Sequence, residues 1–110
     1  MLVRVLGLAA IVLGGLLWLT GHQPYLGPHI GIGFCIAMLV FVMSVIAATK
    51  KAVVLGLVGI LLAVLLPLIG FMQLPLVFHS MGAIQAAHIF VALSVIGIAE
   101  RLHSVIQQAG

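Results

Sequence analysis

The sequence predicts an all-α integral membrane protein built as a four-helix bundle. Of its 110 residues, 65% are apolar and only 5% are charged. A soluble domain of this size leaves much of its surface in contact with water and could not bury so large an apolar share. Four apolar stretches follow one another, none with the alternating polarity of a transmembrane barrel strand. As helices rising about 1.5 Å per residue, they can each cross a hydrocarbon layer about 30 Å thick.

The first apolar stretch predicts a helix over about residues 4–21. Its basic start and apolar middle are typical of a signal peptide, but no clear small-x-small cleavage site follows, so we expect the segment to be retained. The second helix is expected over about residues 29–49, after the stretch GHQPYLGP. Pro28 suits the first turn of that helix, where no backbone N–H is needed.

The third helix is expected over about residues 52–72, after the break TKK, and Pro67 inside it should produce a kink. The fourth is expected over about residues 77–100, and the chain should end in a short amphipathic tail. All four helices belong to a single membrane domain, residues 1–110. Small residues let membrane helices approach closely. We therefore expect helix contacts at Gly7, Gly14, Gly15, Gly56 and Gly59.

The few charged residues lie near the predicted helix ends and set the orientation. The net charge of +3 comes from Arg4, Lys50, Lys51 and Arg101 against the single acid Glu100. The positive-inside rule places both termini and the middle loop in the cytoplasm, as in a bacterial inner-membrane protein. Such sparse charge does not favour nucleic-acid binding. The expected partners are the lipid bilayer and other membrane subunits or further copies of the chain.

Alignment of the sequence with itself at an offset of fifty residues suggests two repeated helical hairpins. His29 then aligns with His79, and a serine motif of the second helix aligns with one of the fourth. Parallel repeats of this kind are related by an axis along the membrane normal. The two histidines would face each other across that axis at one depth. Gly33 and Ala83 lie one turn below them and leave room for a flat ring.

His88 offers a second way to pair the histidines. It follows His79 by nine residues, which is about half a revolution around a helix, so the two side chains point to opposite sides. An ionisable residue deep in a membrane helix is expensive to keep and indicates a function. We prefer His29 and His79 as the facing pair, with His88 as the alternative ligand. A steep tilt of the fourth helix would instead pair His29 with His88.

Two neutral imidazoles on facing membrane helices can serve as the axial ligands of a b-type haem. Here the chain resembles the small four-helix membrane cytochromes b, the cytochrome b561-like group. The resemblance rests on the helix count, on Thr20-Gly21 closing the first helix, and on HIGIG, HIFVA and HSMGA, in which a small residue follows histidine by four positions. It implies no more than one haem, because the first and third helices contain no histidine. The implied role is one-electron transfer, with quinol or quinone as a possible partner.

Other metal sites and other roles stay open. Copper or zinc could bind His22, His29 and His79 with Met72 or Met81 nearby. A single helical histidine could also ligate a chlorophyll-type pigment in an accessory subunit of a respiratory or photosynthetic complex. A small multidrug transporter is disfavoured, because the first helix has no acid. Hydrolysis is disfavoured too, since no nucleophile–base pair or acid pair is recognisable. We therefore expect an electron carrier or a subunit rather than a stand-alone enzyme.

Overall fold

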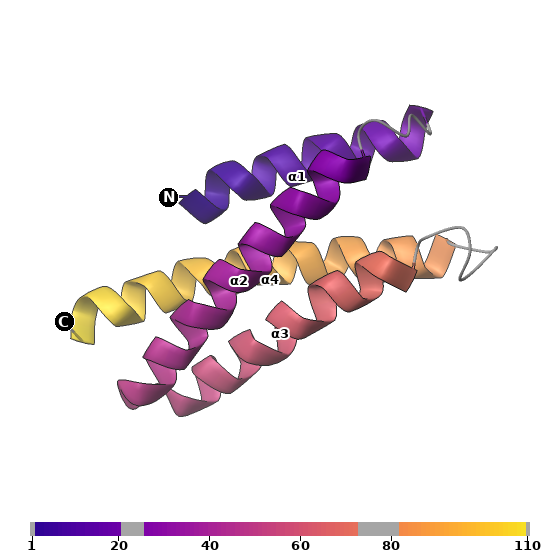
Figure 1. Ribbon diagram of the computed structural model, residues 1–110. Coiled ribbons are helices and arrows are strands. Elements are labelled where there is room, and N and C mark those ends of the chain that lie inside the picture. The colour runs from indigo at the N-terminus through magenta and orange to yellow at the C-terminus, as the bar shows by residue number, and fades with distance from the viewer. Residues whose placement is uncertain (1, 21–25, 73–81, 110) are drawn as a thin grey trace.

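The computed structural model of the chain is a bundle of four α-helices (Figure 1). It describes residues 2–20, 26–72 and 82–109. The helices are α1 (Leu2–Thr20), α2 (Leu26–Thr49), α3 (Val53–Met72) and α4 (Gly82–Ala109). This confirms the predicted all-α four-helix fold.

The helix bounds differ most from the sequence prediction at the end of α4. The helix continues past residue 100 to Ala109, where a short tail was expected. The reason is that the apolar spacing of α4 does not stop at its charged residues: Leu102 is fully buried, and Ile106 packs on the same core. Residues 77–81 of the predicted fourth helix lie outside the described residues. Helix α3 runs through Pro67 without ending there.

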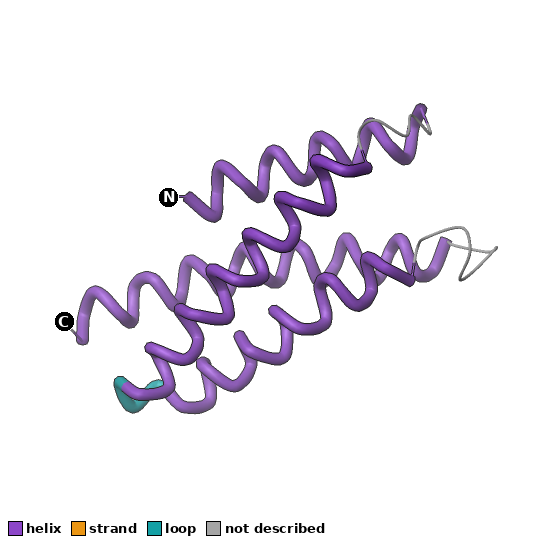
Figure 2. Tube along the Cα trace, viewed as in Figure 1, coloured by secondary structure: helices purple, strands orange, loops and turns teal. Residues whose placement is uncertain are grey.

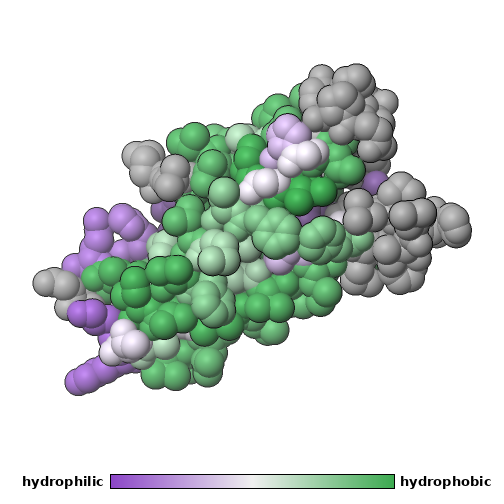
Figure 3. All heavy atoms as spheres, viewed as in Figure 1, coloured by the Kyte–Doolittle hydropathy of each residue, from purple (hydrophilic) through white to green (hydrophobic). Residues whose placement is uncertain are grey.

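Successive helices run in opposite directions along the bundle (Figure 1). Both termini and the turn between α2 and α3 lie at one end (Figures 1 and 2). Helix α1 packs on α2 and α4, while α2 and α4 each also contact α3. The space-filling view shows hydrophilic side chains gathered at the end that holds the termini, with apolar side chains over the middle (Figure 3). This arrangement agrees with the predicted clustering of the basic residues on one side.

Three helices in the described part of the chain are long and apolar enough to cross a membrane. Their candidate spans are Leu26–Thr49, Val53–Phe71 and Ile84–Gln108, while the apolar stretch described in α1, Val3–Leu17, is shorter. Large apolar side chains such as those of Leu8, Val54 and Phe90 are exposed. A soluble fold would bury such residues, whereas a bilayer covers them at no cost. The fold therefore presents a surface suited to lipid.

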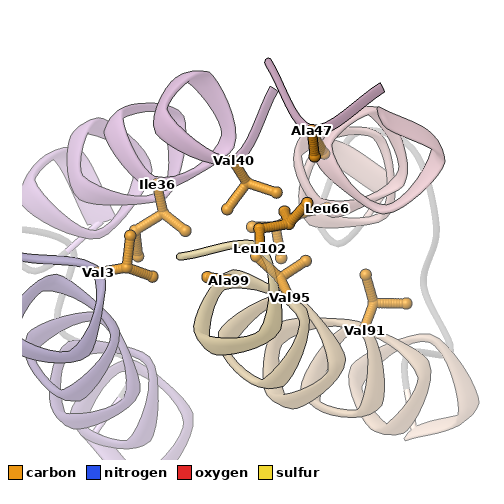
Figure 4. Close-up of a cluster of buried hydrophobic side chains, with 10 residues drawn as sticks. Val3, Ile36, Val40, Ala47, Leu66, Val91, Val95, Ala99 and Leu102 are labelled. Atoms are coloured by element: carbon orange, nitrogen blue, oxygen red, sulfur yellow. The ribbon is translucent and has the colours of Figure 1, made fainter. Parts of the chain in front are cut away.

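The buried core lies between the four helices. In the close-up, the side chains of Ile36, Val40, Leu66 and Val95 point toward one another from α2, α3 and α4 (Figure 4). Val40 and Val95 are fully buried. Ser44 is buried in the same region and donates its hydroxyl hydrogen to the backbone carbonyl of Val40, at 2.6 Å. That bond satisfies the one polar group that the core holds among the described residues.

Glycines allow the closest helix contacts, as the sequence predicted at most positions. A Cβ placed on Gly56 of α3 would lie 2.6 Å from the backbone oxygen of Ser44 in α2, and one placed on Gly59 would collide with the Ser44 side chain. Gly7 of α1 lies similarly close to Ile96 of α4. Gly15 differs, because no neighbouring atom of the described chain comes within 4 Å of its Cβ position.

The turn between α2 and α3 is closed by a left-handed residue. Lys51 has φ 72°, and the next N–H, from Ala52, donates to the carbonyl of Ala47 at 3.0 Å. This bond across six residues is the usual end of a helix at a left-handed position, where glycine is preferred. The turn therefore keeps a lysine in a conformation that its Cβ disfavours.

Candidate functional site

A cavity of about 570 Å³ lies between the helices, a volume in the range of small-molecule and cofactor sites. Its wall takes residues from all four helices and is mostly glycine, alanine, leucine, isoleucine and phenylalanine. The polar side chains in the wall are those of His29, Gln85 and His88. A cavity that is apolar apart from a few convergent polar groups is the arrangement expected of a ligand site.

The two histidines of the cavity face each other from different helices. The ring centroids of His29 in α2 and His88 in α4 lie 6.1 Å apart, with an angle of 67° between the ring planes. Helix α2 runs obliquely across α4 (Figure 1). Residue spacing within α4 does not predict that His88 faces His29, because this facing depends on how the two helices cross. The two imidazoles thus form the polar centre of the cavity.

A backbone carbonyl of α1 orients His29. The Nδ1 atom of His29 lies 3.0 Å from the carbonyl oxygen of Ala10. A carbonyl oxygen only accepts hydrogen bonds, so the proton of the neutral imidazole sits on Nδ1. The Nε2 atom then carries the lone pair. Metal-bound histidines in proteins are commonly held in this way, by a hydrogen bond to the nitrogen that does not bind the metal.

Each imidazole packs against a glycine of the preceding helix. A Cβ on Gly14 of α1 would lie 3.0 Å from Cε1 of His29, and a Cβ on Gly70 of α3 would lie 3.3 Å from Cε1 of His88. A larger residue at either position would require the neighbouring ring to shift by a few tenths of an ångström. The two glycines therefore leave the space that the imidazoles occupy.

His88 lacks the support that His29 has. Its Nδ1 atom is buried and has no hydrogen-bond partner among the described residues. Gln85 lies one turn earlier on α4 and also lines the cavity. A buried nitrogen without a partner costs free energy of about 1–3 kcal/mol. Such an atom is expected where a ligand or cofactor completes the site.

The donor set suits a cofactor that brings most of its own ligands. The described residues contain no group of three or more His, Cys, Asp or Glu side chains placed to hold a metal ion. A haem needs only two axial ligands from the protein. His29 and His88, with ring centroids 6.1 Å apart in an edge-on arrangement, are the two residues that would hold such a group, and haem would supply one-electron chemistry there.

The predicted site residues fall into two groups. His29, His88 and Gly33 all line the cavity, and the Cβ position of Gly33 meets open space. His79 lies outside the described residues, as does the side chain of Ala83, so the pairing of His29 with His79 stays a prediction. The proposed copper or zinc set rests mainly on residues or side chains outside the described part of the chain: His22, Met72, His79 and Met81.

Sequence reasoning missed two supports of the site. The carbonyl of Ala10 carries no signal in the sequence, because every residue has one. Gly70 was not singled out, although Gly14 was expected at a helix contact and does make one, with His29. A search for glycines at the depth of each histidine on the neighbouring helix could have found both glycines.

Comparisons of the chain with family models, with curated proteins and with solved structures give no match.

Proposed function

We propose that the chain is a membrane protein that binds one b-type haem and transfers single electrons, with His29 and His88 as the axial ligands. The observation that carries the proposal is the facing pair of imidazoles, 6.1 Å apart, in an apolar cavity between four helices. The pairing of His29 with His79 is the alternative for the second ligand, and a single experiment distinguishes the two.

The residues of the site have separable tasks in this proposal. Bound haem supplies the one-electron chemistry. His29 offers Nε2 as a ligand because Ala10 holds the proton on Nδ1. The leucine, isoleucine and phenylalanine side chains of the wall exclude water, and an apolar surrounding of this kind is one of the levers by which a protein tunes a redox potential.

A membrane quinol is the electron partner that this architecture favours. Quinols are apolar and lie in the bilayer, where they can reach a protein through its lipid-facing surface. The ring centroids of Phe34 and Phe71 lie 5.6 Å apart. Both side chains line the cavity and are exposed, so they mark a side of the cavity that faces outward. The basic residues at one end of the bundle support an orientation with both termini in the cytoplasm, as in a bacterial inner-membrane protein.

The test is a visible spectrum of the purified protein with four histidine variants. We expect a Soret band and sharp reduced α and β bands from low-spin haem, lost in His29→Ala and in His88→Ala. His103→Ala is the matched control, because His103 is exposed near the end of α4 and far along that helix from the cavity. It should keep the spectrum.

His79→Ala decides between the two pairings. Retention of the low-spin spectrum in this variant supports His88 as the second ligand, whereas its loss with retention in His88→Ala would assign that role to His79. A colourless protein that co-purifies with stoichiometric membrane partners would overturn the haem proposal in favour of an accessory subunit.

A further inference from the structure

We infer that the two imidazoles of the site have unequal roles: His29 is the held ligand, and His88 is an exchangeable ligand whose place a small exogenous molecule can take. This inference rests on the proposed function and adds to it a binding position for such a molecule. It is carried by the difference in how the protein supports the two rings.

His29 is fixed by two contacts from α1. The hydrogen bond to Ala10 sets its tautomer, and Gly14 lies so close that a Cβ added to it would stand 3.0 Å from Cε1 of the ring. Loss of an orienting hydrogen bond of this kind typically lowers metal affinity about 10–100-fold. A ring held in this way keeps its Nε2 lone pair aimed in one direction, so His29 binds without first losing conformational freedom.

His88 has no comparable anchor in the described structure. Its Nδ1 atom has no hydrogen-bond partner among the described residues, so none of them fixes its tautomer. A Cβ built on Gly70 would lie 3.3 Å from Cε1 of His88, against 3.0 Å for Gly14 and His29, so Gly70 leaves the His88 ring slightly more room. His88 could therefore leave a bound metal without breaking a hydrogen bond between its Nδ1 atom and a described residue.

The cavity offers room and one polar group for a replacement ligand. Gln85 lies one turn from His88 on the same helix and lines the same cavity, so its amide can donate to a molecule bound where the imidazole was. The remaining wall is apolar. The fitting ligand class is therefore small and neutral: carbon monoxide on the reduced protein, whose oxygen could accept from that amide, or free imidazole on the oxidised protein, whose remaining N–H could donate to the amide oxygen.

The first experiment needs no cofactor. Nitrogen-15 NMR of the haem-free protein, labelled at histidine, reports the tautomer of each ring. We expect His29 to be almost entirely the Nδ1–H form and His88 to be a mixture. Gly14→Ala should shift His29 toward the mixture, because its Cβ would displace the ring. Gly15→Ala is the matched control, since its Cβ meets open space, and it should leave the tautomer unchanged.

The second experiment uses the haem-loaded protein and two cavity variants. His88→Gly should keep haem in a high-spin form and regain the low-spin spectrum when free imidazole is added. His29→Gly should lose at least ten-fold in haem occupancy and should not be restored at the same imidazole concentration. Wild-type reduced protein should bind carbon monoxide, with His88 displaced.

The outcomes separate this inference from the proposed function. Haem loss of equal size in both glycine variants, or a fixed tautomer for both rings, would overturn the inequality while leaving haem binding intact. A wild-type protein that binds no haem would overturn both the proposed function and the ligand exchange.

Discussion

The polar side-chain atoms inside this bundle differ in their hydrogen-bond partners. The hydroxyl of Ser44 is satisfied within its own helix by the Val40 carbonyl, and Nδ1 of His29 is satisfied by another helix through Ala10. The Nδ1 atom of His88 has no partner among the described residues. In a membrane, where water does not reach the interior, such an atom is costly. Ser44 thus has a structural role, whereas His29 and His88 belong to the candidate functional site.

Replacing Lys51 with glycine should stabilise the folded protein. A left-handed conformation costs an L-residue about 1–2 kcal/mol, and glycine avoids that cost. We expect Lys51→Gly to raise the free energy of unfolding by about 1 kcal/mol, measured by denaturation in mixed detergent micelles. Lys50→Gly removes the same charge at a position where the structure shows no positive φ, and it should give no gain. Equal gains in both variants would mean that the charge, not the backbone, is responsible.

Gly33 should govern how much of the cavity is available. Its Cβ position is open and it lines the cavity, so the side chain of Gly33→Leu should enter that space without separating helices. We expect haem occupancy to fall several-fold, measured as the ratio of Soret to protein absorbance, with the folded yield unchanged. Gly31→Leu is the control on the same helix, because Gly31 is exposed and not in the cavity wall, and the conservative change Leu39→Ile should also be silent. A similar loss in all three variants would contradict this assignment of faces.

At the scale of the helices, the contact between α2 and α3 depends on two glycines facing Ser44. A methyl group at Gly56 would lie 2.6 Å from a backbone oxygen, which cannot move aside as a flexible side chain can. Overpacking of this kind typically costs about 1–3 kcal/mol. Helices α2 and α3 are also joined by the short turn at Lys51, so they form one hairpin held at both the turn and the crossing.

Gly56→Ala should therefore destabilise the protein by about 1–3 kcal/mol, measured in the same micelle assay. Gly97→Ala provides the comparison, since Gly97 lies inside α4 with open space at its Cβ position. Alanine is the better helix former, so that variant should be neutral or more stable by about 0.5–1 kcal/mol. If Gly56→Ala were as stable as Gly97→Ala, the close approach of α2 and α3 would be wrong.

The helices were predictable from the sequence, because apolar length and helix breakers act locally. The extension of α4 to Ala109 was not predicted, since Arg101 suggested an end while Leu102 and Ile106 continued the buried stripe. The facing of His29 and His88 was weighed but not preferred. It depends on the crossing of α2 over α4, and the spacing of residues within one helix does not contain the angle between two helices.

At the scale of the whole molecule, charge is concentrated at one end. Arg4 of α1 donates hydrogen bonds from Nε and Nη2 to the two carboxylate oxygens of Glu100 in α4, the second at 2.6 Å. Glu100 is the only acid of the chain. Both side chains are substantially exposed, so water and salt screen the pair and it adds little to stability. Its main consequence is to place the start of α1 beside the charged part of α4.

The basic end should face the cytoplasm. We expect a reporter fused after Gly110 to be cytoplasmic and one inserted at Tyr25, between α1 and α2, to be external. Alkaline phosphatase and green fluorescent protein fusions in a bacterial host measure this directly. Since the end of α1 and the end of α4 lie at opposite ends of the bundle (Figure 1), signals from the same side would contradict the arrangement of α1 across the membrane.

The depth of the histidine pair has a consequence for energy conversion. Three residues separate His29 from the start of α2, and six separate His88 from the start of α4, at the end away from the termini. At about 1.5 Å per residue, these positions are about 5 Å and 9 Å into the helices. A full crossing of the membrane by one charge is worth about 2.3 kcal/mol per 100 mV. If His29 and His88 hold a haem as proposed, an electron that entered and left at this depth would cross only a small part of that field, so its transfer would contribute little to charging the membrane.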